Sequence, residues 1–181
     1  MRVKSCLFLL CCALMFLSAC QIHTIYDMVN TEFPDIFDGV DSMPPKMRET
    51  YSVGDVIVRP HIVHGTLDTD YKLAVSFYSK TNDWGVSVKE ISSLINGKND
   101  FCGDDGFNPD TWYSSWELYP ENSPYYVLSI WGTEEVSLSV PILKKSRVEV
   151  CLVAAVKKND GQIIWKRIHS CFMPRKRSYL E

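Results

Sequence analysis

Residues 148–172 read VEVCLVAAVKKNDGQIIWKRIHSCF and contain two apolar segments on either side of the turn sequence Asn159-Asp160-Gly161. Successive side chains of a strand point to opposite faces, so the alternate apolar residues collect on one face of each segment. These faces consist of Val148, Val150, Leu152, Ala154 and Val156 and of Ile164, Ile168 and Phe172. The stretch therefore predicts an antiparallel β-hairpin that buries one face.

The same alternation recurs along the chain from residue 51 onward. Residues 71–77 and 136–142 alternate between apolar and polar side chains, and residues 54–64, 84–92 and 125–132 also have strand character. Short strands separated by turn sequences are typical of sandwiches and small barrels. We expect one all-β domain, an antiparallel, immunoglobulin-like β-sandwich of about seven or eight strands with one or two short helical turns.

Two short stretches also fit a helix. The sequence SVKE at residues 87–90 has the form of a capping box, although its neighbours are strands and we favour a strand through Ile91. The sequence NPD at residues 108–110 resembles a helix start, and Trp112, Trp116 and Tyr119 follow it at helical spacing. One or two helical turns are therefore expected after Asn108.

The first residues have the pattern of a secretory leader. Arg2 and Lys4 give a basic start, an apolar run of 11 residues spans Leu7 to Leu17, and small residues follow. A helix needs about 20 apolar residues to cross a bilayer, so the run is too short to be a transmembrane segment. We predict a signal peptide at residues 1–19.

The residues Leu17-Ser18-Ala19-Cys20 resemble the lipobox of bacterial lipoproteins. The resemblance covers the leader alone, and it implies that the leader is removed before Cys20 and that this cysteine carries the lipid. Gln21, in place of the aspartate that favours inner-membrane retention, implies the outer membrane and its periplasmic face; the inner membrane and the cell surface remain alternatives. Without lipid attachment, the pattern describes an ordinary leader that is cut after Ala19.

The segment between the leader and the strands is rich in proline and acidic residues. Its apolar residues leave two interpretations open, a loosely ordered linker or a strap that crosses the domain. We divide the chain into the signal peptide, an acidic, proline-containing tether at residues 20–50, a sandwich domain at 51–174, and a basic tail at 175–181 with Arg175, Lys176 and Arg177.

Charge argues against nucleic acid as a partner. The chain has 19 Lys and Arg against 22 Asp and Glu, a formal net charge of −3. Loss of Arg2 and Lys4 with the leader makes the charge more negative, whereas nucleic-acid binding requires a basic surface.

Three of the seven cysteines remain after the leader and Cys20 are set aside: Cys102, Cys151 and Cys171. Pairing the apolar faces of the hairpin places Cys151 and Cys171 on the same opposite face. They are directly opposed in one register, whereas a three-residue loop sets Cys151 opposite His169 and leaves Cys171 diagonal. We predict a Cys151–Cys171 disulfide, with a bond from Cys102 to either residue as the alternative.

The sequence contains no pattern that indicates catalysis or metal binding. His61 and His64 are expected on opposite faces of a strand, and the acidic loop at residues 99–110 does not fit an EF-hand. The motifs of hydrolases, phosphate-binding loops and zinc proteases are missing from the sequence. We therefore predict a protein that is not an enzyme and that holds no metal and no cofactor.

Seven aromatic residues lie within residues 112–131 and are the strongest remaining signal. If exposed, they would stack on sugars or form the anchor of a protein interface; otherwise they belong to the core. The predicted partner-binding residues are Trp112, Tyr113, Trp116, Asp104 and Asp105.

The primary functional hypothesis is a lipid-anchored, non-catalytic binding module with a protein partner. The alternative is an immunity-type lipoprotein that neutralises a toxin delivered to the periplasm, such as a type VI secretion effector. An enzyme acting on envelope polymers is the least favoured hypothesis. Fold class does not choose among the three.

Overall fold

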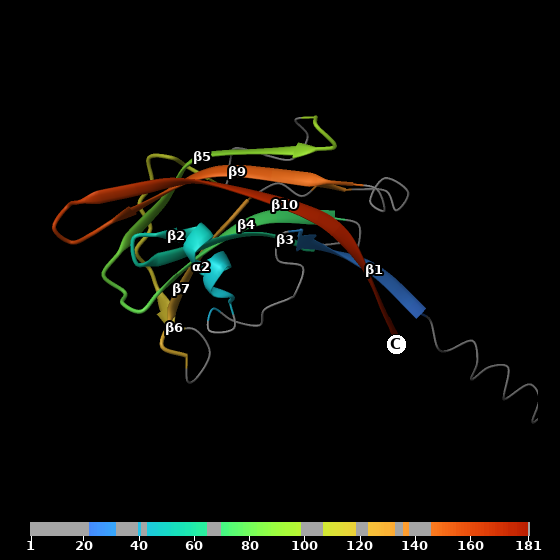
Figure 1. Ribbon diagram of the computed structural model, residues 1–181, viewed down its shortest axis with the longest axis horizontal. Helices are drawn as coiled ribbons and strands as arrows, with labels where there is room; N and C mark the ends of the chain where they lie inside the picture. Colours follow the sequence, from blue (N-terminus) through green and yellow to red (C-terminus); the bar gives the residue numbers. More distant parts are fainter. Residues whose placement is uncertain are drawn as a thin grey trace, which may run out of the picture.

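A computed structural model describes residues 22–31, 40, 43–64, 70–98, 107–118, 123–132, 136–137 and 146–180. It shows two antiparallel sheets packed face to face, so the predicted all-β sandwich is confirmed (Figure 1). No helix among these residues is long and apolar enough to cross a membrane. Cys20, Cys102, Asp104 and Asp105 lie outside the described residues.

Each sheet has a simple strand order. The four-stranded sheet A has the order β1 (Ile22–Asn30), β10 (Ile163–Leu180), β9 (Val148–Lys157), β5 (Gly85–Ile95). Sheet B has the order β2 (Ser52–Val53), β3 (Val56–His64), β4 (Asp70–Ser79), β7 (Tyr126–Trp131), β6 (Glu117–Leu118), and β8 (Val136–Ser137) pairs with β4. The core lies between the sheets.

The β9–β10 hairpin follows the sequence prediction. Val156 lies opposite Ile164 and Val148 lies opposite Phe172, so the apolar faces of the two strands coincide. The turn after Lys158 includes Gly161 at φ 87°, a left-handed backbone conformation that glycine adopts without strain. The hairpin therefore supplies the centre of sheet A.

Residues 85–95 form strand β5, as favoured from the sequence. A β-bulge shifts its register between Val88 and Glu90. Val86 and Val88 are buried before the bulge and Ile95 is buried after it, so the buried positions change from even to odd. This shift explains the helix-like spacing of apolar residues in an extended strand.

No helix forms among residues 107–118, so the helical turns expected there are wrong. The Asn108 side chain accepts a hydrogen bond from the Asp110 backbone N–H at 2.9 Å, and the Asn108 carbonyl accepts one from the Thr111 N–H at 3.1 Å. Asn108 thus closes a turn rather than capping a helix. The chain then continues extended, and Tyr113 forms a bridge with Val86.

The helix of the described chain is α2 (Pro45–Tyr51), which falls in the segment predicted as a tether. Its Met47 and Tyr51 are buried one turn apart. The Tyr51 hydroxyl accepts a hydrogen bond from Asn30 Nδ2 at 2.8 Å and lies 2.8 Å from Ser170 Oγ. These contacts tie α2 to β1 and β10.

The predicted limits of the sandwich at residues 51 and 174 are too narrow. Strand β1 pairs with the last part of β10, from Asn30 opposite Phe172 to Ile22 opposite Leu180. The first part of the expected tether and the expected basic tail are therefore two paired strands. Residues 32–39 and 41–42 of the tether lie outside the described residues.

The predicted Cys151–Cys171 disulfide is not formed, and both thiols are free. The hairpin register sets Cys151 opposite His169 and Cys171 opposite Glu149, so the cysteines are diagonal neighbours. Diagonal positions are about 7–8 Å apart, beyond the Cα separation of about 4.4–6.8 Å that a disulfide usually spans. The turn length therefore explains why this prediction is wrong.

Candidate functional site

Residues 107–118 close one side of the sandwich by contacting the edge of each sheet. Tyr113 exchanges two backbone hydrogen bonds of 2.8 Å with Val86 of β5, and β6 pairs with β7 in sheet B. The edge strands on this side of the sandwich are β5 and β6, and the edge strands on the other side are β1 and β2. Residues 107–118 therefore lie on the side opposite α2 and β1. We call residues 107–118 together with Trp84 the tryptophan edge.

Trp116 is a structural member of this edge. Its indole N–H donates a hydrogen bond of 2.7 Å to the Trp84 carbonyl, and its half-buried ring packs against the core. Trp84 itself is 5% exposed. Because the polar atom of Trp116 is already bonded within the protein, this residue supports the edge rather than offering a hydrogen bond to a partner.

Trp112 lies beside Lys89 of β5 and Lys157 at the end of β9. Lys89 Nζ is 4.4 Å from the centre of its ring and Lys157 Nζ is 5.8 Å away. A cation this close to an indole ring is attracted by the negative face of the ring. A Cβ atom at Gly85 would lie 3.5 Å from Trp112 Cε3, an ordinary van der Waals contact, so the ring packs directly against the start of β5. The half-buried ring of Trp112 is thus fixed in an electropositive surrounding.

A groove of about 490 Å³ runs between this segment and β7. Its walls include Trp112 and Tyr113, which are half-buried, and Trp131, which is 52% exposed. The remaining lining residues are Ser114, Ser115, Glu117, Val127, Leu128 and Ser129. The edge groove therefore combines aromatic walls with hydroxyl groups and one carboxylate among the described residues.

A row of polar side chains crosses sheet B from this groove. Ser129 Oγ lies 2.8 Å from Ser76 Oγ, which lies 3.1 Å from His61 Nε2. Burial, and secondarily the positive charge of Arg59, lower the pKa of His61 to about 4, so its imidazole is neutral at pH 7. Ser76 is 2% exposed and cannot meet a substrate. These contacts fix the side chains of sheet B beside the groove. They lack the geometry of an activated nucleophile.

A second and larger hollow, the end pocket, lies at the end of the sandwich where the β9–β10 turn and the loop after β4 meet. It has a volume of about 760 Å³. Lys158 Nζ lies 5.3 Å from the ring centre of Trp84, and Lys80 Nζ lies 5.8 Å from that of Tyr125. Its charged lining residues are Arg48, Lys80, Lys158, Asp55, Asp83 and Asp160. Three positive and three negative side chains leave this pocket without a dominant charge.

The outer face of sheet A carries a separate charged cluster. Arg147 Nε lies 3.0 Å from Cys171 Sγ and 3.1 Å from Glu149 Oε1, and His169 Nε2 lies 3.7 Å from Glu149 Oε2. The hydrogen bond to Cys171, with the negative charge nearby, raises the pKa of Arg147. Because Cys171 is 7% exposed, the cluster orders the strand surface and does not present a reactive thiol.

The structure brings together Trp112 and Tyr113 of the predicted site and places Trp116 behind them. Trp131 belongs to the aromatic segment at residues 112–131 but is not one of the five predicted site residues, although strand alternation puts it on the outward face of β7 with Ser129. No group of three or more metal-binding side chains occurs in the described part of the chain. The chain matches no protein-family model, no curated protein and no solved structure.

Proposed function

We propose that the protein is a non-catalytic binding module that takes a protein partner in the edge groove and is held by lipid at Cys20 on the periplasmic side of the outer membrane. The observation that carries the proposal is the groove of about 490 Å³ with Trp112, Tyr113 and Trp131 in its walls. Aromatic residues beside a hollow are the usual anchors of protein interfaces.

The groove is suited to contact rather than to reaction. Apolar rings provide area that a partner removes from water, and the serine hydroxyls provide hydrogen bonds that fix its orientation. Glu117 is the one carboxylate among the described lining residues. Lys89 and Lys157 beside Trp112 favour a partner that brings an acidic side chain to this end of the groove.

The lipid anchor is supported by the sequence LSAC at residues 17–20. Each methylene group of an acyl chain that enters the bilayer contributes about 0.8 kcal/mol, so two or more chains hold a protein permanently. Cys20→Ser should release the protein from membranes and abolish labelling by a fatty-acid analogue. Unchanged fractionation and labelling would contradict the anchor.

The groove is tested by site-specific photocrosslinking in cells. The aromatic photoreactive residue benzoylphenylalanine, which keeps a ring at position 131, should give a discrete crosslinked partner there, whereas the same residue at position 165 should not. Trp165 is the matched control because it is 71% exposed on sheet A, away from the groove. Trp112→Ala should remove the crosslink from position 131. Equal crosslinking from positions 131 and 165 would reject the groove as the binding site.

A further inference from the structure

The first strand begins almost at the proposed lipid attachment site. Strand β1 starts at Ile22, two residues after Cys20, and Ile22 pairs with Leu180 of β10. One residue of extended chain spans at most about 3.6 Å, so Cys20 lies within about 7 Å of the first paired residue. The described chain thus leaves no long spacer between the lipid and sheet A.

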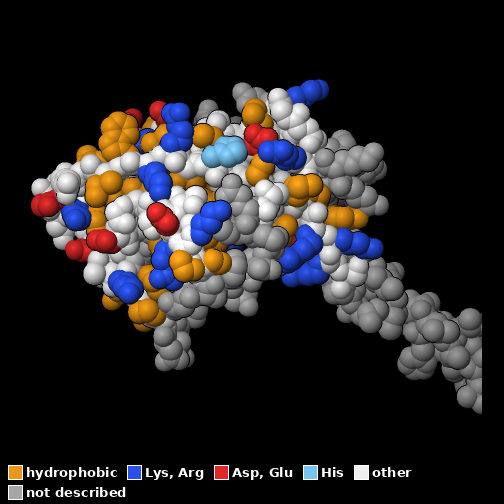
Figure 2. All heavy atoms as spheres, in the orientation of Figure 1, with side chains coloured by type: hydrophobic (Ala, Val, Ile, Leu, Met, Phe, Trp, Pro, Cys, Tyr) orange, Lys and Arg blue, Asp and Glu red, His pale blue; other side chains and the backbone are white. Residues whose placement is uncertain are grey.

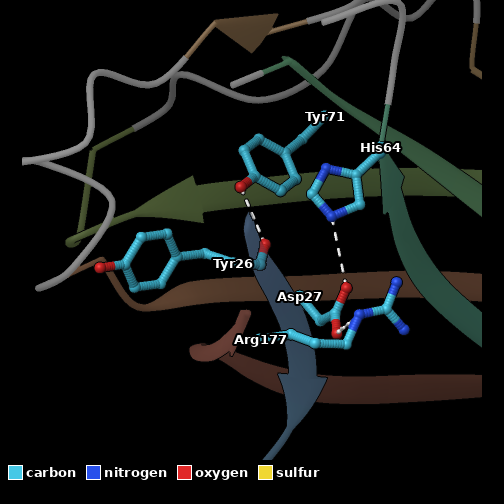
Figure 3. A network of polar contacts seen from close by, with 5 residues as sticks. All are labelled: Tyr26, Asp27, His64, Tyr71 and Arg177. Carbon is cyan, nitrogen blue, oxygen red and sulfur yellow. Dashed lines mark hydrogen bonds and ion pairs between the residues drawn. The ribbon is translucent and has the colours of Figure 1, made fainter. Parts of the chain in front are cut away.

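The strands β1 and β10 are fixed to the rest of the sandwich by a polar network (Figure 3). Asp27 Oδ1 lies 3.3 Å from His64 Nε2 of β3, and Asp27 Oδ2 lies 3.6 Å from Arg177 Nε of β10. The Tyr71 hydroxyl donates a hydrogen bond of 2.9 Å to the Tyr26 carbonyl. These contacts join β1 to both sheets, so an anchor at the start of β1 orients the whole domain.

The end of this strand pair is positively charged. Arg175, Lys176 and Arg177 are all exposed, and strand alternation directs them to both faces of β10. Asp27 is the one acidic residue in the sequences of β1 and β10. Figure 2 shows Lys and Arg side chains gathered at the end of the molecule where these strands run out.

We infer that this end of the sandwich lies on the membrane and that Arg175, Lys176 and Arg177 contact the phosphate groups of anionic phospholipids. The inference rests on the lipid anchor proposed above and adds a second, electrostatic contact to it. A basic residue beside an anionic membrane surface increases binding by about fivefold, and the effect is screened within a Debye length. The anchor and the basic residues lie at the same end and act on the same surface.

The orientation directs the tryptophan edge away from the lipid. Lys157 and Ile163 pair at the opposite end of β10 from Lys176. Thirteen residues at about 3.3 Å each separate Ile163 from Lys176, so the two ends lie up to about 43 Å apart along the strand. The end pocket and Trp112, which lie near Lys157 and Lys158, therefore face the aqueous compartment.

Lysine footprinting of the acylated, full mature protein tests this orientation. The protein is placed in vesicles of phosphatidylcholine with phosphatidylglycerol, or of phosphatidylcholine alone, and treated with a water-soluble amine-acylating ester. Lys176 should be modified about fivefold more slowly in the anionic vesicles, and high salt should remove the difference. Lys157, an exposed residue at the far end, should react equally in both.

A pair of matched variants sharpens the test. Arg175→Gln should reduce the protection of Lys176, whereas Arg167→Gln, an exposed arginine on the same face of β10, should not. Equal modification of Lys176 in both vesicle types, with the protein still floating with the vesicles, would overturn this inference and leave the anchor intact. Failure to float would instead reject the anchor.

Discussion

The two sides that close the sandwich use aromatic residues in different ways. On the α2 side, Tyr51 is 1% exposed and its hydroxyl contacts both Asn30 and Ser170. On the tryptophan edge, Trp112 is half-buried in the wall of a groove of about 490 Å³, and Trp131 of β7 in the same groove is 52% exposed. On the α2 side the aromatic ring packs within the chain. At the tryptophan edge part of the aromatic surface is left available to another molecule.

The contrast between the two sides indicates which rings can be changed without unfolding the domain. A buried ring with bonded polar atoms contributes to stability, and its removal leaves a cavity and unpaired groups. A ring at the wall of a hollow has fewer neighbours to lose. Substitution of the buried ring on the α2 side should therefore lower stability, whereas substitution of a ring in the groove wall should mainly lower partner binding.

The largest effect is expected for Tyr51. Tyr51→Ala should lower the free energy of unfolding by about 3–5 kcal/mol, because it empties a fully buried site. Tyr51→Phe should lower it by about 1–2 kcal/mol, because Asn30 and Ser170 lose their shared partner. Urea denaturation measures both values. A Tyr51→Phe variant as stable as the wild type would mean that the hydroxyl contacts do not hold the α2 side.

The next largest effect is a pH dependence of stability that comes from His61, in the row of polar side chains beside the groove. The pKa of His61 is about 4 in the folded protein against 6.5 without the protein environment, so the unfolded chain binds more protons between these values. Stability should fall as the pH drops from 6.5 to 4, by about 2 kcal/mol after allowance for partial exposure of the ring. His61→Gln should lose this part of the pH dependence, and His169→Gln is the control. An identical dependence in wild type and His61→Gln would contradict the lowered pKa of His61.

A smaller effect is expected for Trp116, the supporting residue of the edge. Trp116→Phe should lower the free energy of unfolding by about 1 kcal/mol, because the Trp84 carbonyl loses its indole donor while an aromatic ring remains. The crosslink from position 131 should persist, because the groove walls are intact. Loss of that crosslink without loss of stability would assign Trp116 to the binding surface instead.

The smallest change in stability is expected for Trp131. Trp131→Ala should alter the free energy of unfolding by less than about 0.5 kcal/mol, as for most exposed positions. Partner binding should nevertheless be lost, whereas Trp165→Ala should affect neither quantity. A large loss of stability in Trp131→Ala would remove the contrast between the two sides.

Much of the fold follows from local sequence patterns. The alternation in residues 148–156 and the Asn159-Asp160-Gly161 turn predict the central hairpin, because a strand with one buried face cannot slip by one residue. Of the two interpretations of residues 20–50, the strap agrees with strand β1, whose partner is β10 at the other end of the sequence. Composition near Asp27 does not reveal such a distant pairing.

The candidate site was predictable in part. The density of aromatic residues in 112–131 identified the region, but the separate roles of Trp112 and Trp116 depend on which ring faces β5 and which faces Trp84. Helical spacing suggested a common face for the two rings. The extended backbone that pairs Tyr113 with Val86 gives them different neighbours instead.

The pairing of β1 with β10 also sets an order of events during folding. Every residue of β1 pairs within residues 172–180, so sheet A cannot be completed until β10 has been synthesised. Pairing across such a long sequence separation is slow, and the outer edge of β10 stays open until β1 arrives. A chain truncated at residue 171 would keep the hairpin but lose every residue of β10 that pairs with β1, leaving the edge of sheet A exposed.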